Sequence, residues 1–188
     1  MTDWNANQYL KFQNQRTQPA VDLAARVAAR HQPRTIADIG CGPGNSTAVL
    51  KGIFPNAHIL GIDHSPNMIE KAQKEHPELE FRLCDALALK GKYDLLFSNA
   101  CLQWIPDHHT LIPALMDKLT PGGVLAVQVP MNGEEPLYQI IKAVAAETKW
   151  GLGDVSLPVN ETLTPLAYYD ILSGCSSAFD IWEIKYYH

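Results

Sequence analysis

The chain has 188 residues, 46% of them hydrophobic and 19% charged, the composition of a globular domain able to bury a core. Its 15 basic and 20 acidic residues give a formal net charge of −5, and no basic cluster contains interleaved aromatic residues. Binding to nucleic acid through phosphates is therefore not expected. No apolar run reaches the length of a membrane span, and the first residues lack the pattern of a signal peptide. We expect a single cytoplasmic domain, residues 1–188, with no nucleic-acid or membrane partner.

Cysteine and histidine spacing gives no sign of a metal site. The four cysteines form no Cys-x-x-Cys pair, which favours free thiols in a reducing compartment. His108 and His109 are adjacent, and adjacent helical positions point about 100° apart. No acidic or cysteine cluster stands at ligand spacing from them. We therefore expect no bound metal.

Two helices are predicted before the first strand, forming a helical cap over residues 1–33. The first covers residues 5–15 and carries Tyr9, and Thr17 is expected to cap the second, with Pro19 in its first turn. Because the cap precedes the first strand, it can lie over the carboxyl ends of the strands. Arg16 falls in the joint between the helices, where it could equally be a solvated surface cation.

A strand, a glycine-rich turn and a helix are predicted between residues 35 and 53. Gly40, Gly42 and Gly44 give the spacing G-x-G-x-G, and Asn45 stands where a dinucleotide-binding motif needs its third glycine. Asp38 lies within the strand end, where a carboxylate suits a ligand with an ammonium group better than a pyrophosphate. S-Adenosylmethionine has an α-amino group, a carboxylate for backbone donors and no phosphate. The alternative is an ordinary tight turn between a strand and a helix.

The second predicted strand, residues 57–63, ends in Asp63, about twenty residues after the glycines, where a ribose-binding carboxylate belongs. The alternative is an acid that marks the next helix, since Ser65 can cap that helix and Pro66 can open it. Met68 could pack against adenine, although a methionine at this spacing is more often part of the core.

Further polar residues follow the third and fourth predicted strands. Asp85, after the strand 80–84, could accept the exocyclic amine of adenine or be an exposed loop acid. Asn99, Gln103 and Trp104 follow the strand 93–99, at the mouth of the crevice where substrate should lie. Trp104 could instead pack against a helix. In an open parallel sheet the carboxyl ends of these strands line one crevice.

The remaining pattern completes an alternation of strands and helices. A helix over residues 110–119 is expected to stop at 120–123 and to precede a fifth strand, 124–129. Helices are then expected at 136–149 and 164–172, around a loop or lid at 150–164, and the alternation after residue 179 predicts an edge strand. The fold class is therefore α/β with a doubly wound, mostly parallel sheet. A cofactor-binding core would cover residues 34–130, and residues 131–188 would form the C-terminal part.

Taken together, the sequence resembles the class I methyltransferases that use S-adenosylmethionine, and within them the narrower family of trans-aconitate 2-methyltransferases. The glycine motif points to the superfamily, whereas the stretches around residues 15–17 and 99–104 point to the narrower family. The resemblance is carried by Asp3-Trp4-Asn5, Tyr9-Leu-Lys-Phe12, Gln15-Arg16-Thr17, Asp38-Ile-Gly-Cys-Gly-Pro-Gly-Asn-Ser-Thr47, Gly61-Ile-Asp63, Phe97-Ser-Asn-Ala-Cys-Leu-Gln-Trp104, Pro121-Gly-Gly123, Ala126-Val-Gln128, Trp182-Glu183, Tyr186 and His188.

The resemblance implies a Rossmann-like sheet that normally closes with a hairpin of two strands. Members of the family continue past the position of His188, so the sheet is expected to be truncated and to lack the last of its usual seven strands. An unpaired edge strand is also an association hazard. We expect a monomer or a weak homodimer.

The resemblance further implies transfer of the sulfonium methyl group to a carboxylate oxygen of a small polycarboxylic acid, giving a monomethyl ester and S-adenosylhomocysteine. Arg16 would clamp a carboxylate of the substrate, or instead hold the methionyl carboxylate of the cofactor. Weaker substrate-side candidates are Gln103, Trp104, Tyr9 and Trp150. The expected cofactor-binding residues are Asp38, Gly40, Cys41, Gly42, Gly44, Asp63, His64, Met68, Asp85, Ala86 and Asn99.

Three other functions remain open at this point. The chain could methylate a malonyl thioester on a carrier protein. It could bind a nicotinamide cofactor as an oxidoreductase, against which Asn45 in place of glycine argues. It could also be a truncated module that binds S-adenosylmethionine and catalyses nothing.

Overall fold

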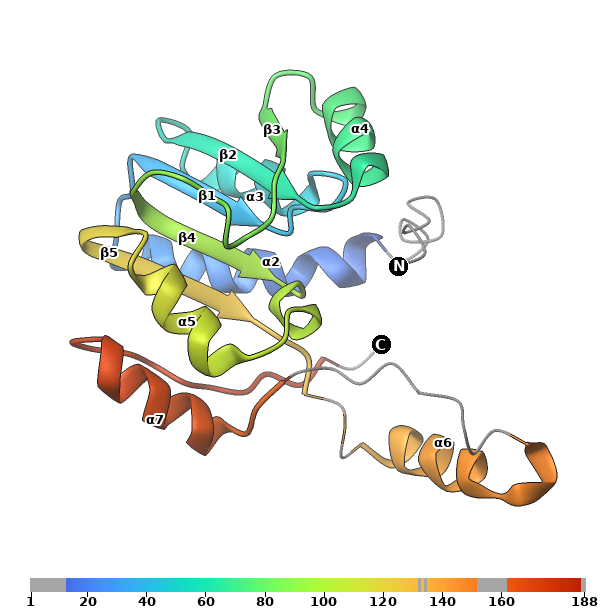
Figure 1. Cartoon of the computed structure of the whole chain (residues 1–188). Coiled ribbons are helices and arrows are strands. Elements are labelled where there is room, and N and C mark those ends of the chain that lie inside the picture. The colour runs from blue at the N-terminus through green and yellow to red at the C-terminus, as the bar shows by residue number, and fades with distance from the viewer. Residues whose placement is uncertain (1–12, 132, 134, 152–161, 187–188) are drawn as a thin grey trace.

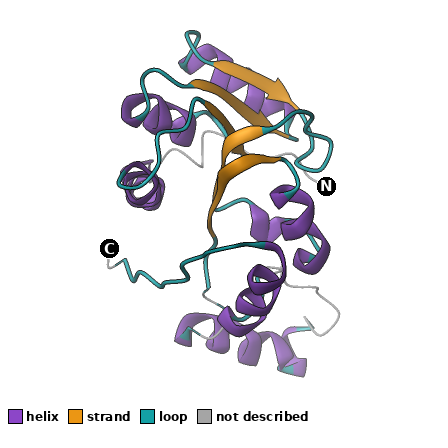
Figure 2. Ribbon diagram, turned by 90° about the vertical axis from the view of Figure 1, so that its left-hand side faces the viewer, coloured by secondary structure: helices purple, strands orange, loops and turns teal. Residues whose placement is uncertain are grey.

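The computed structural model describes residues 13–131, 133, 135–151 and 162–186, and gives only the backbone for residues 13–16 (Figure 1). A five-stranded parallel sheet with the order β3-β2-β1-β4-β5 lies between helices on both faces (Figure 2). The sheet confirms the predicted α/β class. The elements are α2 (Gln13–Ala28), β1 (Thr35–Ile39), α3 (Asn45–Ile53), β2 (His58–Asp63), α4 (Pro66–Glu75), β3 (Glu80–Leu83), β4 (Tyr93–Asn99), η2 (Leu102–Trp104), α5 (His108–Met116), β5 (Leu119–Gln128), α6 (Pro136–Ala146), η3 (Thr148–Trp150) and α7 (Pro165–Cys175).

Alternation along the strands places apolar side chains on both faces of the sheet. Ile36, Leu95 and Phe97 pack on the face covered by α2 and α3. Leu60 and Leu96 pack on the other face, with side chains of α5 and α7. The strands are therefore buried on both sides, as expected for a parallel sheet.

The strand order reverses between β1 and β4, and this position defines the crevice. Asp38 of β1 stands opposite Gly61 of β2 on one side and Phe97 of β4 on the other. Asn99 at the end of β4 stands opposite Gln128 at the end of β5. In open parallel sheets, ligands bind beyond the carboxyl ends of the strands at such a reversal.

Two predicted helix caps are confirmed. Ser65 precedes α4, accepts a hydrogen bond from the Met68 N–H and is followed by Pro66 in the first helical position. Thr164 caps α7 in the same way, by accepting from the Ala167 N–H. These side chains satisfy N–H groups that the helices leave unpaired.

The predicted break in the N-terminal helical cap is wrong. Helix α2 already includes Gln13, so Thr17 lies inside the helix rather than at its start, and the joint expected at Arg16 is helical. Pro19 also lies within the helix. Burial of the apolar face that contains Leu23 and Val27 stabilises the continuous helix against the cost of an internal proline.

The helix before β5 is shorter than predicted, and residues 120–123 do not stop it. Helix α5 ends at Met116, and residues 120–123 are part of β5. The register between β4 and β5 shifts between Tyr93 and Leu95, and Gly122 has a positive φ of 78°. Glycine tolerates this backbone conformation, so the Pro-Gly-Gly sequence forms an irregularity within the strand.

The predicted C-terminal edge strand is also wrong for the residues that the structure describes. Residues 176–186 form no strand or helix, and their side chains contact α2 and the turn that follows it. Asp180 pairs with Arg30 at 2.7 Å, the Trp182 ring lies 4.1 Å from the Arg26 guanidinium carbon, and Tyr186 donates to Asp22. Alternation alone does not form a strand, because a strand needs a partner for its backbone groups.

Helix α6 and η3 project away from the sheet (Figures 1 and 2). Helix α6 ends at Ala146, earlier than predicted, and a short 3₁₀ turn follows. Most of the expected lid falls on residues 152–161, which lie outside the described part of the chain. None of the described helices is long and apolar enough to cross a membrane.

Asp94 joins three strands at the amino end of the sheet. One carboxylate oxygen accepts from the N–H groups of Arg34 and Thr35, at 2.9 and 3.1 Å, and the other accepts from the Thr120 hydroxyl at 2.8 Å. These bonds, chiefly that from Thr120, lower the pKa of Asp94 below its ordinary value. A lowered pKa means that the bonds stabilise the fold above the unfolded pKa of about 3.9, and that this stability is lost as the pH falls.

We therefore expect Asp94→Asn to lower the free energy of unfolding at pH 7 by on the order of 1–3 kcal/mol, because two backbone donors lose a charged acceptor. Urea denaturation of both proteins at pH 7 and near pH 3 measures the difference. The difference should shrink at the lower pH; a gap of the same size at both pH values would contradict this role.

Candidate active site

The glycine-rich loop after β1 leaves room for a ligand beside its backbone. Gly40 and Gly42 have φ values of 71° and 55°, which side chains with a Cβ rarely adopt. A Cβ added to Gly42 would meet no heavy atom within 4 Å. At Gly40 the same position is already filled, because the Cys101 Sγ would lie 2.1 Å away. The space beside the loop is therefore open at Gly42, whereas at Gly40 the side chain of Cys101, in the loop after β4, fills it.

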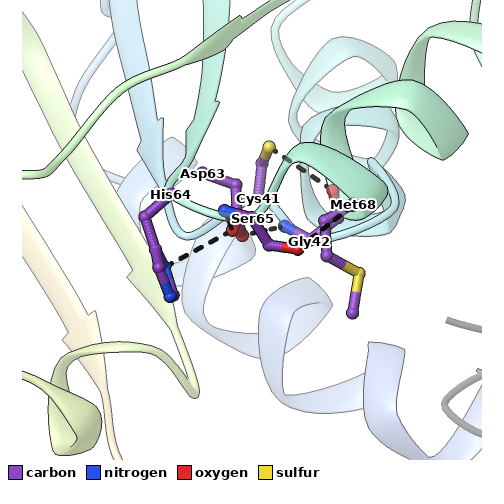
Figure 3. Close-up of polar contacts among 6 residues, drawn as sticks. All are labelled: Cys41, Gly42, Asp63, His64, Ser65 and Met68. Atoms are coloured by element: carbon purple, nitrogen blue, oxygen red, sulfur yellow. Dashed lines mark hydrogen bonds and ion pairs between the residues drawn. The ribbon is translucent and has the colours of Figure 1, made fainter. Parts of the chain in front are cut away.

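Asp63, the last residue of β2, ties this loop to the start of α4 (Figure 3). One carboxylate oxygen accepts from the Gly42 N–H at 3.0 Å, and the other accepts from the Ser65 N–H at 2.9 Å. His64 is exposed, with Nδ1 at 3.6 Å from the second oxygen. A carboxylate has about four acceptor positions. Asp63 is thus held in place and can still accept two further hydrogen bonds.

Cys41 and Met68 line the inner side of the same corner (Figure 3). Cys41 is buried against Ile69 and Ala72, and its thiol lies 3.6 Å from the Gly42 carbonyl. Burial raises the pKa of Cys41, so the thiol stays protonated. Met68 is buried beside the Ser65 cap. Both side chains therefore form part of the wall of the crevice, and neither is an exposed reactive group.

Asp38 is a fully buried carboxylate directly below the loop. The hydroxyls of Ser46 and Thr47 both donate to its Oδ2 at 2.6 Å. Burial nevertheless raises the pKa of Asp38 to about 6, although the two hydrogen bonds act in the opposite direction. Sequence reasoning missed Ser46 and Thr47; their position directly after the glycines, at the start of α3, was the available signal.

Asp85 and Ala86 follow β3 beside the Asp63 corner, since Asp63 stands opposite Leu83 in the sheet. The Asp85 carboxylate accepts from the Leu87 N–H at 2.8 Å and is exposed. Ala86 is buried. The tips of β1, β2 and β3 are thus adjacent, as the sequence predicted.

The loop after β4 is held tightly on the other side of the crevice. Ala100 has a φ of 52°, unusual for a residue other than glycine, and such strain persists only where surrounding contacts fix it. Burial raises the pKa of Cys101 to about 12, so its thiol is uncharged. Gln103 is buried, and its Nε2 donates to the Ala100 carbonyl at 2.8 Å. Trp104 is 47% exposed.

Four buried side-chain atoms have no hydrogen-bond partner among the described residues, and all four are acceptors. They are Asp38 Oδ1, Asn99 Oδ1, Gln103 Oε1 and Gln128 Oε1. A buried acceptor without a donor costs free energy, so the arrangement favours a ligand that brings N–H or O–H groups. S-Adenosylmethionine brings an ammonium, two ribose hydroxyls and an adenine amine, and the residues present therefore fit this cofactor.

Three of the predicted substrate-side residues are not placed at the crevice. Tyr9 lies outside the described residues, and the Arg16 side chain is not described, although its backbone belongs to the first turns of α2. Trp150 is exposed in η3, in the part of the chain that projects from the sheet. Across the described ranges, no three His, Cys, Asp or Glu side chains are grouped so as to hold a metal ion.

Fold and crevice together define a methyltransferase that uses S-adenosylmethionine, and residues 36–123 match the sequence profile of the family described as "Methyltransferase domain". Over its whole length the chain is 45% identical to the trans-aconitate 2-methyltransferase of Methylobacterium radiotolerans, of which it covers 74%. It is 44% identical to that of Shigella flexneri, of which it covers 73%. The chain belongs to the trans-aconitate 2-methyltransferase family.

Solved structures agree on the fold. The Haemonchus contortus phosphoethanolamine N-methyltransferase 2 in complex with S-adenosyl-L-methionine superposes with a TM-score of 0.64 at 18% identity, covering 84% of this chain and 36% of that one. The magnesium protoporphyrin IX methyltransferase of Synechocystis with bound S-adenosylmethionine gives a TM-score of 0.50 at 26% identity, covering 56% and 55%. Both of these neighbours are methyltransferases with S-adenosylmethionine bound.

The raised pKa of Asp38 predicts a pH dependence of stability without ligand. Between the unfolded pKa of about 3.9 and the folded pKa of about 6, the folded state binds more protons, so stability falls as the pH rises. Asp38→Asn removes this dependence. We expect the variant to exceed the wild type in free energy of unfolding by about 1–3 kcal/mol at pH 8, and to lose that advantage at pH 4.

Urea denaturation at the two pH values measures this effect, and calorimetry with S-adenosylhomocysteine should show weaker binding by the same variant. A variant that is less stable than the wild type at pH 8 would show that ionised Asp38 does not burden the ligand-free fold.

Proposed function

We propose that the chain transfers the methyl group of S-adenosylmethionine to a carboxylate oxygen of trans-aconitate, giving a monomethyl ester and S-adenosylhomocysteine. The observation that carries the proposal is the 45% identity to a trans-aconitate 2-methyltransferase over the whole chain. The carrier-protein and nicotinamide alternatives have no comparable support.

The cofactor would lie across the tips of β1 to β4. Asp63 would accept both ribose hydroxyls with the acceptor positions that Gly42 and Ser65 leave free. Asp85 would accept the adenine amine, with Ala86 and Met68 beside the ring. The remaining contacts of the amino-acid part and the ribose would come from Asp38, Gly40, Cys41, Gly42, Gly44, His64 and Asn99.

The chemistry needs no general base, because a carboxylate is already ionised at pH 7. When bound, the cofactor supplies an electrophilic methyl group on a positively charged sulfur. The protein's task is to align the carboxylate oxygen with that methyl group and to exclude water. Arg16 would hold a carboxylate of the substrate, or else that of the cofactor, with Tyr9, Trp104 and Trp150 as further substrate-side candidates.

The proposal also includes the division of the chain into three parts that the sequence predicts. The cap 1–33 and the C-terminal part 131–188 would complete the substrate side of a core formed by residues 34–130. We propose that the enzyme works in the cytoplasm as a monomer or a weak homodimer, without nucleic-acid or membrane partners.

Mass spectrometry of the products tests the reaction. The chain is incubated with methyl-labelled S-adenosylmethionine and, in separate reactions, with a panel of dicarboxylic and tricarboxylic acids that includes trans-aconitate and with a malonyl thioester on a carrier protein. A labelled trans-aconitate monomethyl ester is expected. Labelling of a malonyl thioester on a carrier protein instead would select the alternative acceptor, and cofactor binding without product would indicate a non-catalytic module.

Asp63→Ala should raise the dissociation constant of S-adenosylhomocysteine at least tenfold, on the order of 1–3 kcal/mol for lost hydrogen bonds to a charged acceptor. Isothermal calorimetry measures the constant. Glu80→Ala, which removes an exposed carboxylate from the amino end of β3, is the matched control and should bind normally. Unchanged affinity in Asp63→Ala would remove this residue from the site.

Arg16→Ala should lower kcat/KM for trans-aconitate on the order of a hundredfold, because a bidentate contact to a carboxylate is lost. Steady-state kinetics measures the ratio, and circular dichroism checks the fold. Arg30→Ala, which removes an exposed ion pair from the turn after α2, is the control. A rise in KM for the cofactor alone would assign Arg16 to the cofactor; wild-type kinetics would exclude both roles.

A further inference from the structure

Gln103 has a buried acceptor that nothing in the described fold satisfies. The residue is 3% exposed, in η2 directly after the β4 loop. Its Nε2 donates to the Ala100 carbonyl at 2.8 Å, whereas its Oε1 is buried without a partner among the described residues. A buried oxygen without a donor lowers the stability of the fold, and a ligand that donates a hydrogen bond to it removes that cost.

The orientation of this amide is fixed by its neighbour. Exchanging Oε1 and Nε2 would place an oxygen against the Ala100 carbonyl oxygen, and two acceptors repel each other. The peptide unit before Ala100 is held as well, since the Ala100 N–H donates to the Gln128 carbonyl at 2.9 Å. The group of Gln103 that has no partner within the described fold is therefore an acceptor, Oε1.

The same segment lies against the glycine-rich loop. Cys101 fills the space beside Gly40, and the Ser98 hydroxyl donates to the Ile39 carbonyl at 3.0 Å. The β4 loop is thus packed on the end of β1, at the reversal of strand order. Gln103 belongs to the junction of β1 and β4 and not to an outer rim of the crevice.

The chemistry of the free oxygen selects between the two ligands of the reaction. An ionised polycarboxylate brings acceptors only, so its carboxylates would be repelled by Gln103 Oε1. The α-ammonium of the cofactor brings three N–H donors. Gln103 Oε1 is one of four unpaired buried acceptors in the described fold, at or just after the carboxyl ends of β1, β4 and β5, with Asp38 Oδ1, Asn99 Oδ1 and Gln128 Oε1. We propose that Gln103 binds the α-ammonium of S-adenosylmethionine, an inference that rests on the proposed function and moves Gln103 from the substrate side to the cofactor side.

Calorimetry with two probes tests the assignment. S-Adenosylhomocysteine carries the ammonium, and 5′-methylthioadenosine shares its adenosine and sulfur but lacks the amino-acid part. Gln103→Met keeps the size of the side chain and removes the acceptor. We expect it to weaken S-adenosylhomocysteine binding about tenfold or more, as for a lost hydrogen bond to a charged group, and to leave 5′-methylthioadenosine binding unchanged.

Gln73→Met is the matched control, because the Gln73 amide also donates to a backbone carbonyl, that of Phe81, outside the crevice. It should bind both probes like the wild type. If Gln103→Met fails to fold, Gln103→Asn serves instead, because its side chain is one methylene shorter and moves the amide away from the ligand. It should likewise weaken the binding of S-adenosylhomocysteine and leave that of 5′-methylthioadenosine unchanged.

Equal weakening of both probes by Gln103→Met would reduce Gln103 to a structural role and overturn the proposal. Unchanged affinity for both, with a raised KM for trans-aconitate, would return it to the substrate side. Failure of the wild type to bind S-adenosylhomocysteine would instead refute the cofactor site itself, so the two failures are distinguishable.

Discussion

The carboxylate of Asp63 is the contact on which the cofactor half of the molecule depends. By accepting from the Gly42 and Ser65 backbone N–H groups, it fixes the glycine-rich loop of β1 against the start of α4. A loop with several positive φ angles has many conformations when free, and this anchor selects one of them. The open space beside Gly42 thus exists before a ligand arrives, which lowers the ordering cost of binding.

A second constraint is the excess of acceptors in the crevice. The buried Asp38 carboxylate has a raised pKa, and the unpaired oxygens of Asn99, Gln103 and Gln128 have no donors in the described structure. These groups make the ligand-free fold less stable than it would be with apolar residues. A cationic ligand with N–H donors pairs with these acceptors and removes that cost. The free energy recovered on binding contributes to the affinity and the selectivity for such a ligand.

The parts of the fold that local pattern determines could be predicted from the sequence. The β4 bounds, the Ser65 and Thr164 caps and the adjacent tips carrying Gly40, Asp63 and Asp85 follow from periodicity and parallel topology. Features that depend on a distant partner could not be predicted. Residues 176–186 alternate like a strand but contact α2, and the Gln103 amide is oriented by the strained backbone of Ala100.

The central claim is that the cofactor lies across the tips of β1 to β4. Backbone amide chemical shifts of the ¹⁵N-labelled 20.8 kDa chain, followed during titration with S-adenosylhomocysteine, test it most directly. The largest changes should fall on Gly42, Gly44, Asp63, Asp85 and Ala100, with little change at the amino end of the sheet around Asp94. Changes centred on α6 or around Asp94, with the glycine-rich loop unaffected, would contradict the account.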